Sequence, residues 1–213
     1  MSFLPITIKY LGLQPYELVY QQMQAFTQQR TLDTPDEIWL LQHFSVFTLG
    51  RNSKLEHILQ HSHIPEVQID RGGQVTYHAP GQLVVYVLLD LKRRNLGVRQ
   101  LVTLLENCII HFLQQNGVVA KNKKTAPGVY VEGKKIAALG LRVSKGRCYH
   151  GLCLNVDMDL TPYQQINPCG YADLQVTQCV LLGIDKTIEK ITEEVLECLL
   201  SELDSQLRKS LEV

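Results

Sequence analysis

The segment Val129–Val156, VYVEGKKIAALGLRVSKGRCYHGLCLNV, decides the fold class. It contains three runs rich in β-branched and aliphatic residues, and Gly133 and Gly146 separate them. Short strands punctuated by glycine are typical of hairpins, because tight turns require residues that accept positive φ. The segment therefore predicts an antiparallel meander. Its strands are expected at residues 129–131, 135–143 and 149–156.

Upstream of the meander, alternating or continuous apolar runs predict six more strands. They are expected at residues 6–11, 37–42, 45–49, 67–69, 75–78 and 83–89. The last run is continuously apolar, which is typical of a strand buried on both faces. Ala79-Pro80-Gly81 places proline and glycine at the central positions of a type II turn, so we predict that the strands flanking it form a hairpin.

Three helices complete the prediction. Residues 15–30 have Pro15 at the first helical position, and residues 98–116 end at Gly117, where a left-handed cap belongs. A long amphipathic helix begins near Ile188. Hairpin strands with a few segregated helices are typical of an α+β fold, and 213 residues fit one domain, residues 1–213.

Composition excludes several classes of protein. Lys plus Arg equals Asp plus Glu at 21 each, and no apolar run approaches the roughly 20 residues that cross a bilayer. The amino-terminal residues have the features of neither a signal peptide nor a transit peptide, so we expect a cytoplasmic protein. Six cysteines without a C-x-x-C pair predict free thiols in a reducing compartment.

The charge is unevenly distributed along the chain. Residues 1–91 carry 5 basic and 8 acidic side chains, residues 92–147 carry 12 and 2, and residues 148–213 carry 4 and 11. The middle block of +10 predicts an acidic partner, unless opposite blocks neutralise each other in the fold. No zinc-finger spacing or aromatic-interleaved RNA-binding signature occurs, which favours a small acidic protein over a nucleic acid.

The common phosphate-binding and esterase motifs are absent from the sequence. A metal site at His57, His61 and His63 is an alternative, but their segment is predicted to be a polar loop without a matching cysteine. We therefore predict no metal.

Among the cysteines, Cys169 differs in its context. The other five lie in or near predicted strands and helices, where a buried thiol is the simpler interpretation. Cys169 stands in the turn Asn167-Pro168-Cys169-Gly170, where a substrate can reach it and the Gly170 N–H can face a developing oxyanion. A thiol is a few per cent ionised at neutral pH, so a nucleophilic cysteine needs a cation or base beside it.

Three residues are candidates for that cation or base: His78, His150 and Lys135. Either histidine could equally be a hydrogen-bonded structural residue. Lys135 begins an apolar strand, where burial would lower its pKa, whereas the neighbouring Lys134 points to the opposite, solvated face.

Several motifs follow one another in register along the chain. They are Arg71–His78 (RGGQVTYH), Pro80–Gln82 (PGQ), Gly133–Ile136 (GKKI) with Leu139–Gly140, His150–Leu152 (HGL) with Leu154–Val156, and Ile166–Gly170 (INPCG). Together they resemble the octanoyl-[acyl-carrier-protein]:protein octanoyltransferases of lipoate biosynthesis, over nearly the whole chain. Two positions depart from that family: Ala79 where glycine is usual, and Cys153 where alanine is common, which adds a second thiol near the acyl site.

The resemblance implies a fold shared with the biotin and lipoate protein ligases, a mixed, largely antiparallel sheet flanked by helices. It implies that Cys169 forms an acyl thioester and that Lys135 favours its thiolate and shuttles protons. It also implies an octanoyl pocket with glycines that admit a flexible chain and with apolar lining from Val75, Tyr77 and others. The implied pocket residues are Arg71, Gly72, Gly73, Gln74, Val75, Thr76, Tyr77, His78, Ala138, Leu139, Gly140, Gly151, Leu152 and Cys153.

The resemblance further implies octanoyl-acyl-carrier protein as the donor. The implied acceptors are the lipoyl domains of 2-oxoacid dehydrogenase E2 subunits and the glycine cleavage H protein. No cofactor is implied beyond the phosphopantetheine that the donor carries, and we expect a monomer that binds no membrane. Because carrier proteins are acidic, the basic block is a candidate docking surface. Its residues are Lys92, Arg93, Arg94, Lys121, Lys123, Lys124, Lys145 and Arg147.

Two alternatives remain open at this point. An ATP-dependent lipoate or biotin ligase on the same fold would activate a free acid as an adenylate and would need no cysteine. A noncatalytic nucleic-acid binder would use the basic block but would leave the glycine-rich and Asn-Pro-Cys-Gly motifs unexplained.

Overall fold

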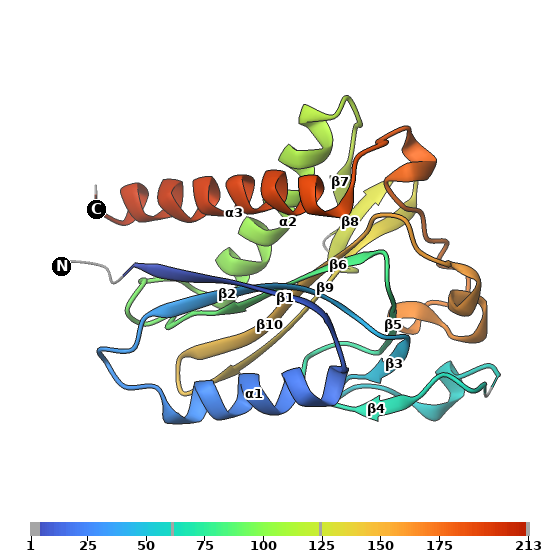
Figure 1. Ribbon diagram of the computed structural model, residues 1–213, viewed down its shortest axis with the longest axis horizontal. Helices are drawn as coiled ribbons and strands as arrows, with labels where there is room; N and C mark the ends of the chain where they lie inside the picture. The colour runs from blue at the N-terminus through green and yellow to red at the C-terminus, as the bar shows by residue number, and fades with distance from the viewer. Residues whose placement is uncertain (1–4, 61, 124, 212–213) are drawn as a thin grey trace.

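A seven-stranded sheet lies at the centre of the molecule (Figure 1). The computed structural model describes residues 5–60, 62–123 and 125–211. The sheet has the order β1-β2-β6-β10-β9-β8-β7, and among these strand pairs β1 and β2 are parallel while the others are antiparallel. Its strands are β1 (Ile6–Gln14), β2 (Asp36–His43), β6 (Gln82–Leu88), β7 (Lys121–Asn122), β8 (Gly128–Val131), β9 (Lys134–Ser144) and β10 (Arg147–Asn155). The predicted mixed, largely antiparallel sheet and its β8-β9-β10 meander are confirmed.

A smaller sheet of three strands adjoins the large one. Its order is β4-β3-β5, with bounds β3 (Val46–Leu49), β4 (Glu66–Gln68) and β5 (Val75–His78). The prediction that β5 and β6 form a hairpin is wrong. Strand β6 pairs with β2 on one edge and β10 on the other, so no edge remains for β5. The turn after β5 therefore passes the chain from one sheet to the other.

Three helices cover the two faces of the large sheet (Figure 1). Helix α1 (Tyr16–Gln29) lies on one face, and α2 (Val98–Gln115) and α3 (Ile188–Leu211) lie on the other. Alternation along β2 explains the two layers, because Trp39 packs with the α1 side and Ile38 with the α2 and α3 side. All three predicted helices are confirmed, although Pro15 is the N-cap residue of α1 rather than its first helical residue. No helix in the described ranges has the length and apolar character needed to cross a bilayer.

Two irregular segments run side by side beside the small sheet. The first contains η1 (Leu55–His57); the second contains η2 (Thr161–Gln165) and η3 (Pro168–Gly170) and continues to η4 (Val180–Leu182). The backbone N–H of Leu59 donates to Gln165 (2.8 Å), and that of Asn167 donates to the carbonyl of His57 (2.8 Å). The first segment therefore anchors the turn that carries Cys169.

Candidate functional site

The turn at Cys169 is backbone-strained. Cys169 has φ 58° and ψ 15°, the left-handed region that non-glycine residues avoid at a cost of about 1–3 kcal/mol. Its side chain is partly exposed, whereas the other five cysteines are buried free thiols, as predicted. The backbone N–H of Gly170 donates to the carbonyl of Asn167 at 2.9 Å. The prediction that this N–H faces an oxyanion is therefore wrong, because the turn itself uses it.

Lys135 lies beside this sulfur. Its Nζ is 3.0 Å from Cys169 Sγ and 3.2 Å from the carbonyl oxygen of Pro127. The side chain is buried with 4% exposure, while Lys134 is exposed, as the strand alternation predicted. A Cβ at Gly128 would lie 3.0 Å from Lys135 Cε, so glycine there gives the lysine its path. The structure thus joins the two residues that the sequence singled out.

Backbone pairing fixes the two residues relative to each other. The N–H of Lys135 donates to the carbonyl of Gln175 (2.8 Å), and the N–H of Thr177 donates to the carbonyl of Lys135 (2.9 Å). The segment that follows the Cys169 turn therefore runs along the start of β9. This backbone pairing brings Lys135 and Cys169 together, although they are 34 positions apart in the sequence and the turn at Cys169 itself is not paired with a strand.

The pKa of Lys135 differs from the prediction. Burial is the largest single influence and favours the neutral amine, as expected. Charge and hydrogen-bond interactions with Cys169, and then with Tyr130, favour the ammonium and raise the pKa of Lys135 above its ordinary value. The contact with Cys169 therefore opposes the effect of burial on Lys135.

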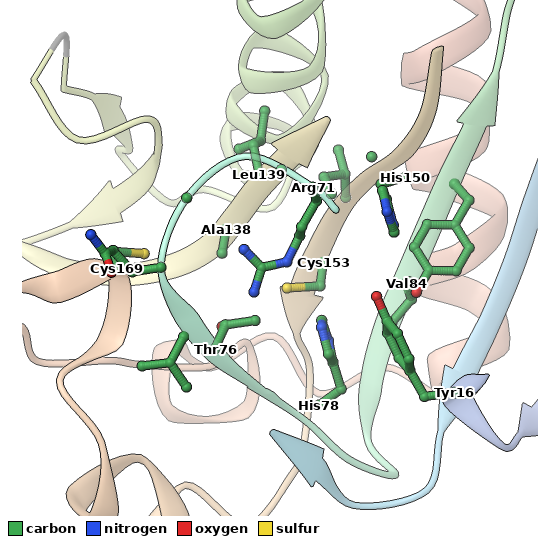
Figure 2. A pocket seen from close by; sticks show the side chains of 17 residues that line it. Tyr16, Arg71, Thr76, His78, Val84, Ala138, Leu139, His150, Cys153 and Cys169 are labelled. Atoms are coloured by element: carbon green, nitrogen blue, oxygen red, sulfur yellow. The ribbon is translucent and has the colours of Figure 1, made fainter. Parts of the chain in front are cut away.

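A narrow cavity of about 50 Å³ extends from Cys169 into the core (Figure 2). Twelve of the fourteen predicted pocket residues line it: Arg71, Gly73, Gln74, Val75, Thr76, His78, Ala138, Leu139, Gly140, Gly151, Leu152 and Cys153. Gly72 lines a neighbouring cavity instead, and Tyr77 lines neither. The ring of Tyr77 packs against Phe47 and Tyr163, with centroids 5.4 and 5.5 Å apart, in a separate hydrophobic cluster.

Arg71 occupies the middle of the narrow cavity (Figure 2). Its Nη2 donates to both the carbonyl and the hydroxyl of Thr48, each at 2.9 Å. A Cβ at Gly140 would lie 2.8 Å from Arg71 Cδ. This glycine therefore makes room for the arginine stem.

Sequence reasoning missed the wall farthest from Cys169. Tyr16, Val84 and Tyr86 line that end together with His150, and Figure 2 shows Tyr16, Val84 and His150 across the cavity from Cys169. No local signal marked these residues, because Tyr16 opens a helix and Val84 and Tyr86 belong to a continuous apolar strand.

Three histidines of this region have lowered pKa values. Burial lowers the pKa of His78 to about 3 and that of His43 to about 4, and it also lowers the pKa of His150. His78 shares hydrogen bonds with Gln82 (2.7 Å) and Thr48 (3.3 Å). Of the three candidate cations or bases, Lys135 is the one in contact with Cys169.

A wider cavity of about 380 Å³ meets the narrow one at Cys169. Lys135 lines this wider cavity and is not among the residues that line the narrow one. Most of its walls are apolar, and Thr125 and Tyr171 add polar groups. Its lining residues are Gly72, Gly73, Gln74, Val98, Val102, Thr125, Ala126, Pro127, Lys135, Leu139, Gly140, Leu141, Cys169 and Tyr171.

The basic block is only partly available for docking. Arg94 is buried and paired with Asp36, and Arg93 also contacts this carboxylate, so these two residues of the predicted surface serve the fold. Four lysines of the block are exposed: Lys92, Lys121, Lys123 and Lys145. Arg147 is half-buried near Asp90, and Lys124 lies outside the described residues.

The alternative metal site has no support among the described residues, where no three His, Cys, Asp or Glu side chains are grouped to hold an ion. His61 lies outside the described residues. His57 lies instead beside the turn that carries Cys169, with Nε2 at 3.3 Å from the Cβ position of Gly170.

Comparisons with known proteins identify the relatives of this chain. Residues 15–200 match the family model described as the lipoyl protein ligase A/B catalytic domain. The chain is 53% identical over 199 residues to the octanoyltransferase of Psychromonas ingrahamii, covering 93% of this chain and 92% of the relative. It is 53% identical over 193 residues to the octanoyltransferase of Chromobacterium violaceum, covering 91% of this chain and 93% of that protein.

Two solved structures show the fold. A lipoate-protein ligase A bound with ATP superposes with a TM-score of 0.77 at 14% identity, covering 97% of this chain and 94% of that one. The biotin protein ligase of Aquifex aeolicus in complex with biotin and ATP gives 0.60 at 14% identity, covering 95% and 72%. The predicted likeness to the biotin and lipoate ligase fold is confirmed.

Proposed function

This chain belongs to the lipoyl protein ligase A/B catalytic domain family, and we propose that Cys169 carries the acyl group as a thioester between donor and acceptor. The chain is an acyltransferase that transfers octanoyl groups in protein lipoylation, since octanoyltransferases share 53% of its residues over 93% of its length. The observation that carries the mechanism is the 3.0 Å contact between Lys135 Nζ and Cys169 Sγ.

In the first half-reaction, the thiolate of Cys169 attacks the thioester carbonyl of the donor. The octanoyl chain enters the narrow cavity, whose walls are mainly apolar and which must widen from about 50 Å³ to hold eight carbons. The donor's pantetheine arm lies in the wider cavity. Collapse of the tetrahedral intermediate expels the pantetheine sulfur, which takes a proton from the Lys135 ammonium. The products are the octanoyl thioester of Cys169, a free thiol and a neutral lysine.

In the second half-reaction, Lys135 serves as the base. Once Cys169 is acylated, the sulfur carries no charge, so the larger of the interactions that raise the pKa of Lys135 is lost, while its burial and the smaller Tyr130 interaction remain. The neutral amine of Lys135 then accepts a proton from the ammonium of the target lysine. The target lysine, now a neutral amine, attacks the thioester. The thiolate leaves, the amide forms, and one proton passes to solvent.

The donor and acceptors remain those that the resemblance implied: octanoyl-acyl-carrier protein, the lipoyl domains of 2-oxoacid dehydrogenase E2 subunits, and the glycine cleavage H protein. The exposed lysines of the basic block would dock the acidic carrier. No cofactor beyond the donor's pantetheine takes part in the proposed steps. We further infer a single catalytic domain over residues 1–213, acting as a monomer in the cytoplasm, and six free cysteines support that compartment.

The ATP-dependent ligase alternative rests on structures at 14% identity, which inform on fold alone. No feature of the described site favours adenylate chemistry over thioester transfer.

Intact-mass measurement tests the thioester directly. Incubation with octanoyl-acyl-carrier protein, without an acceptor, should add one octanoyl group to the protein, and peptide mapping should place it on Cys169. The adduct should be labile to hydroxylamine and absent from Cys169→Ser. No adduct in the wild-type protein, or an adduct that persists in the variant, would reject the proposal.

A further inference from the structure

The reacting carbonyl has a defined place if the proposed function holds. Its acyl chain lies in the narrow cavity, and the arm that carries the leaving sulfur or the attacking nitrogen lies in the wider one. The carbonyl carbon must therefore lie where the two cavities meet, next to Cys169. Five residues line both cavities: Gly73, Gln74, Leu139, Gly140 and Cys169.

Among these five shared residues, Gln74 and Cys169 have polar side chains. Oε1 of Gln74 is buried and has no hydrogen-bond partner among the described residues. A buried amide oxygen without a partner costs about 1–3 kcal/mol, so its presence on this half-buried side chain at the junction needs a physical reason. A substrate group that pairs with this amide would supply one.

Gln74 also lies against the turn that carries Cys169. Its Cγ is 3.0 Å and its Cδ 3.4 Å from the position that a Cβ would take at Gly170. The Gly170 N–H cannot stabilise an oxyanion, because it donates to Asn167 within the turn. The amide of Gln74 can donate there, since rotation about its last bond exchanges the oxygen and the two N–H donors.

We propose that the side-chain amide of Gln74 donates a hydrogen bond to the oxyanion of the tetrahedral intermediate in both half-reactions. When Cys169 Sγ bonds to the carbonyl carbon, the π electron pair of C=O moves onto oxygen, which becomes negative. Gln74 stabilises that charge without transferring a proton. When the intermediate collapses, the pair returns to C=O and the leaving sulfur departs with its own bonding electrons.

The test compares two reactions of the same sulfur. S-octanoyl-pantetheine acylates Cys169 through an oxyanion, whereas S-octyl methanethiosulfonate modifies it by attack at sulfur, without one. Gln74→Met keeps a side chain of similar size but removes the N–H donors and adds no charge. We expect the acylation rate to fall about 10²–10³-fold, the usual effect of removing one oxyanion donor, and the thiosulfonate rate to stay within about threefold.

Gln165→Met is the matched control. Gln165 also has a buried Oε1 without a partner and precedes the same turn, but it lines neither cavity. Both rates of this variant should match the wild type. Gln74→Ala provides a second variant and should repeat the selective loss if the amide, rather than side-chain bulk against Gly170, is responsible.

Two results would overturn the inference: an unchanged acylation rate in Gln74→Met, or equal losses in both reactions, which would mean that Gln74 only shapes the turn. These are distinguishable from failure of the proposed function, because then the wild-type protein itself would form no octanoyl adduct.

Discussion

Two polar clusters among the described residues, one around Asp36 and one around Lys135, are built differently. Three arginine side chains converge on Asp36, whose carboxylate is fully buried, while Lys135 and Cys169 form a pair that opens onto two cavities. The three arginines are Arg30, Arg93 and Arg94. Several ion-pair partners in a solvent-excluded environment keep the charge of Asp36 constant. Lys135 instead has one reactive partner, so a reaction at the sulfur of Cys169 can change the charge beside it.

The pKa directions follow this difference. Burial of Asp36 is the largest influence and by itself raises its pKa, but the Arg94 and Arg30 interactions outweigh it, and the pKa of Asp36 is lowered. No reaction step removes those arginines. For Lys135, the influences that oppose burial come from Cys169 and then Tyr130, and the proposed acylation would remove the first of them. We infer that the first cluster serves stability and the second serves catalysis, and the predictions below test that division.

The largest effect is expected from Cys169→Ala. Without a nucleophile, octanoyl transfer to a lipoyl domain should fall more than about 10³-fold. The thermal unfolding midpoint should change little, because the thiol is partly exposed and the residue retains its backbone conformation. Mass spectrometry of the acceptor measures the transfer. Turnover near the wild-type rate would instead favour the ATP-dependent alternative.

Lys135→Met should come next, with a loss of about 10²–10⁴-fold in transfer, because it removes the proton carrier but keeps the apolar stem. Rapid-quench assays of the two half-reactions can measure it, and the fold should persist. The neighbouring Lys134→Met is the control. Its side chain is exposed, so the rates should stay within about twofold of the wild type. A Lys135→Met protein with ordinary rates would overturn the role assigned to this lysine.

Asp36→Asn should have the opposite effects: a large loss of stability and little change in the transfer rate. It leaves three arginine side chains without their buried anion, and breaking a buried ion pair costs about 3–5 kcal/mol of folding free energy. Urea denaturation measures this loss. Transfer by the remaining folded protein, measured well below its unfolding midpoint, should stay within about twofold. If stability were unchanged, the division between the two clusters would be wrong.

Acidification should act through the neutral histidines, which belong to neither charged cluster. The pKa of His43 falls from 6.5 to about 4 and that of His78 to about 3, so both bind protons mainly when unfolded. Their contribution to stability is therefore present above pH 6.5 and declines as the pH falls toward these folded values. At about pH 5, each should lower the free energy of unfolding by about 2 kcal/mol relative to neutral pH.

Urea denaturation at several pH values measures this slope. His43→Gln or His78→Gln should each make it shallower, even if the variant is less stable at neutral pH. A stability that does not change between neutral pH and pH 5 would contradict the assignment of neutral buried histidines.

The smallest effect concerns docking. Lys123 is exposed, and Thr125, two residues later, lines the wider cavity that Lys135 also lines. Lys123→Glu should raise the KM for octanoyl-acyl-carrier protein about 3–10-fold at low salt, with a smaller effect at high salt. The KM for S-octanoyl-pantetheine, which has no acidic protein, should not change. Equal effects on both donors would locate the defect in the cavity rather than on the surface.

Cys169 and Lys135 could be selected from sequence as candidates because their signals are local. Cys169 stands in a turn without bulky neighbours, and strand alternation separates Lys135 from Lys134. The direction of the Lys135 pKa could not be predicted, since it depends on a sulfur 34 residues away. The Gly170 prediction failed for a related reason, because a backbone N–H can be assigned to a substrate only when its turn partner is known.

For the fold, periodicity located most of the strands but not all of their partners. The meander after Gly128 joins neighbours in sequence, so its pairing followed from short turns. Strand β6 instead pairs with strands from distant parts of the chain, and an apolar run does not encode which strand takes each edge. The same run hid Val84 and Tyr86, because a strand buried on both faces gives no sign of which side chain borders a cavity.

The most direct test of the account is a single-turnover chase. The octanoylated protein is isolated, freed of donor, and mixed with an excess of an apo lipoyl domain while both masses are followed in time. We predict that the octanoyl group leaves Cys169 and arrives on the acceptor lysine in equal amounts, at a rate no slower than steady-state turnover. An acyl group that stays on the enzyme, or that moves more slowly than turnover, would contradict the central claim.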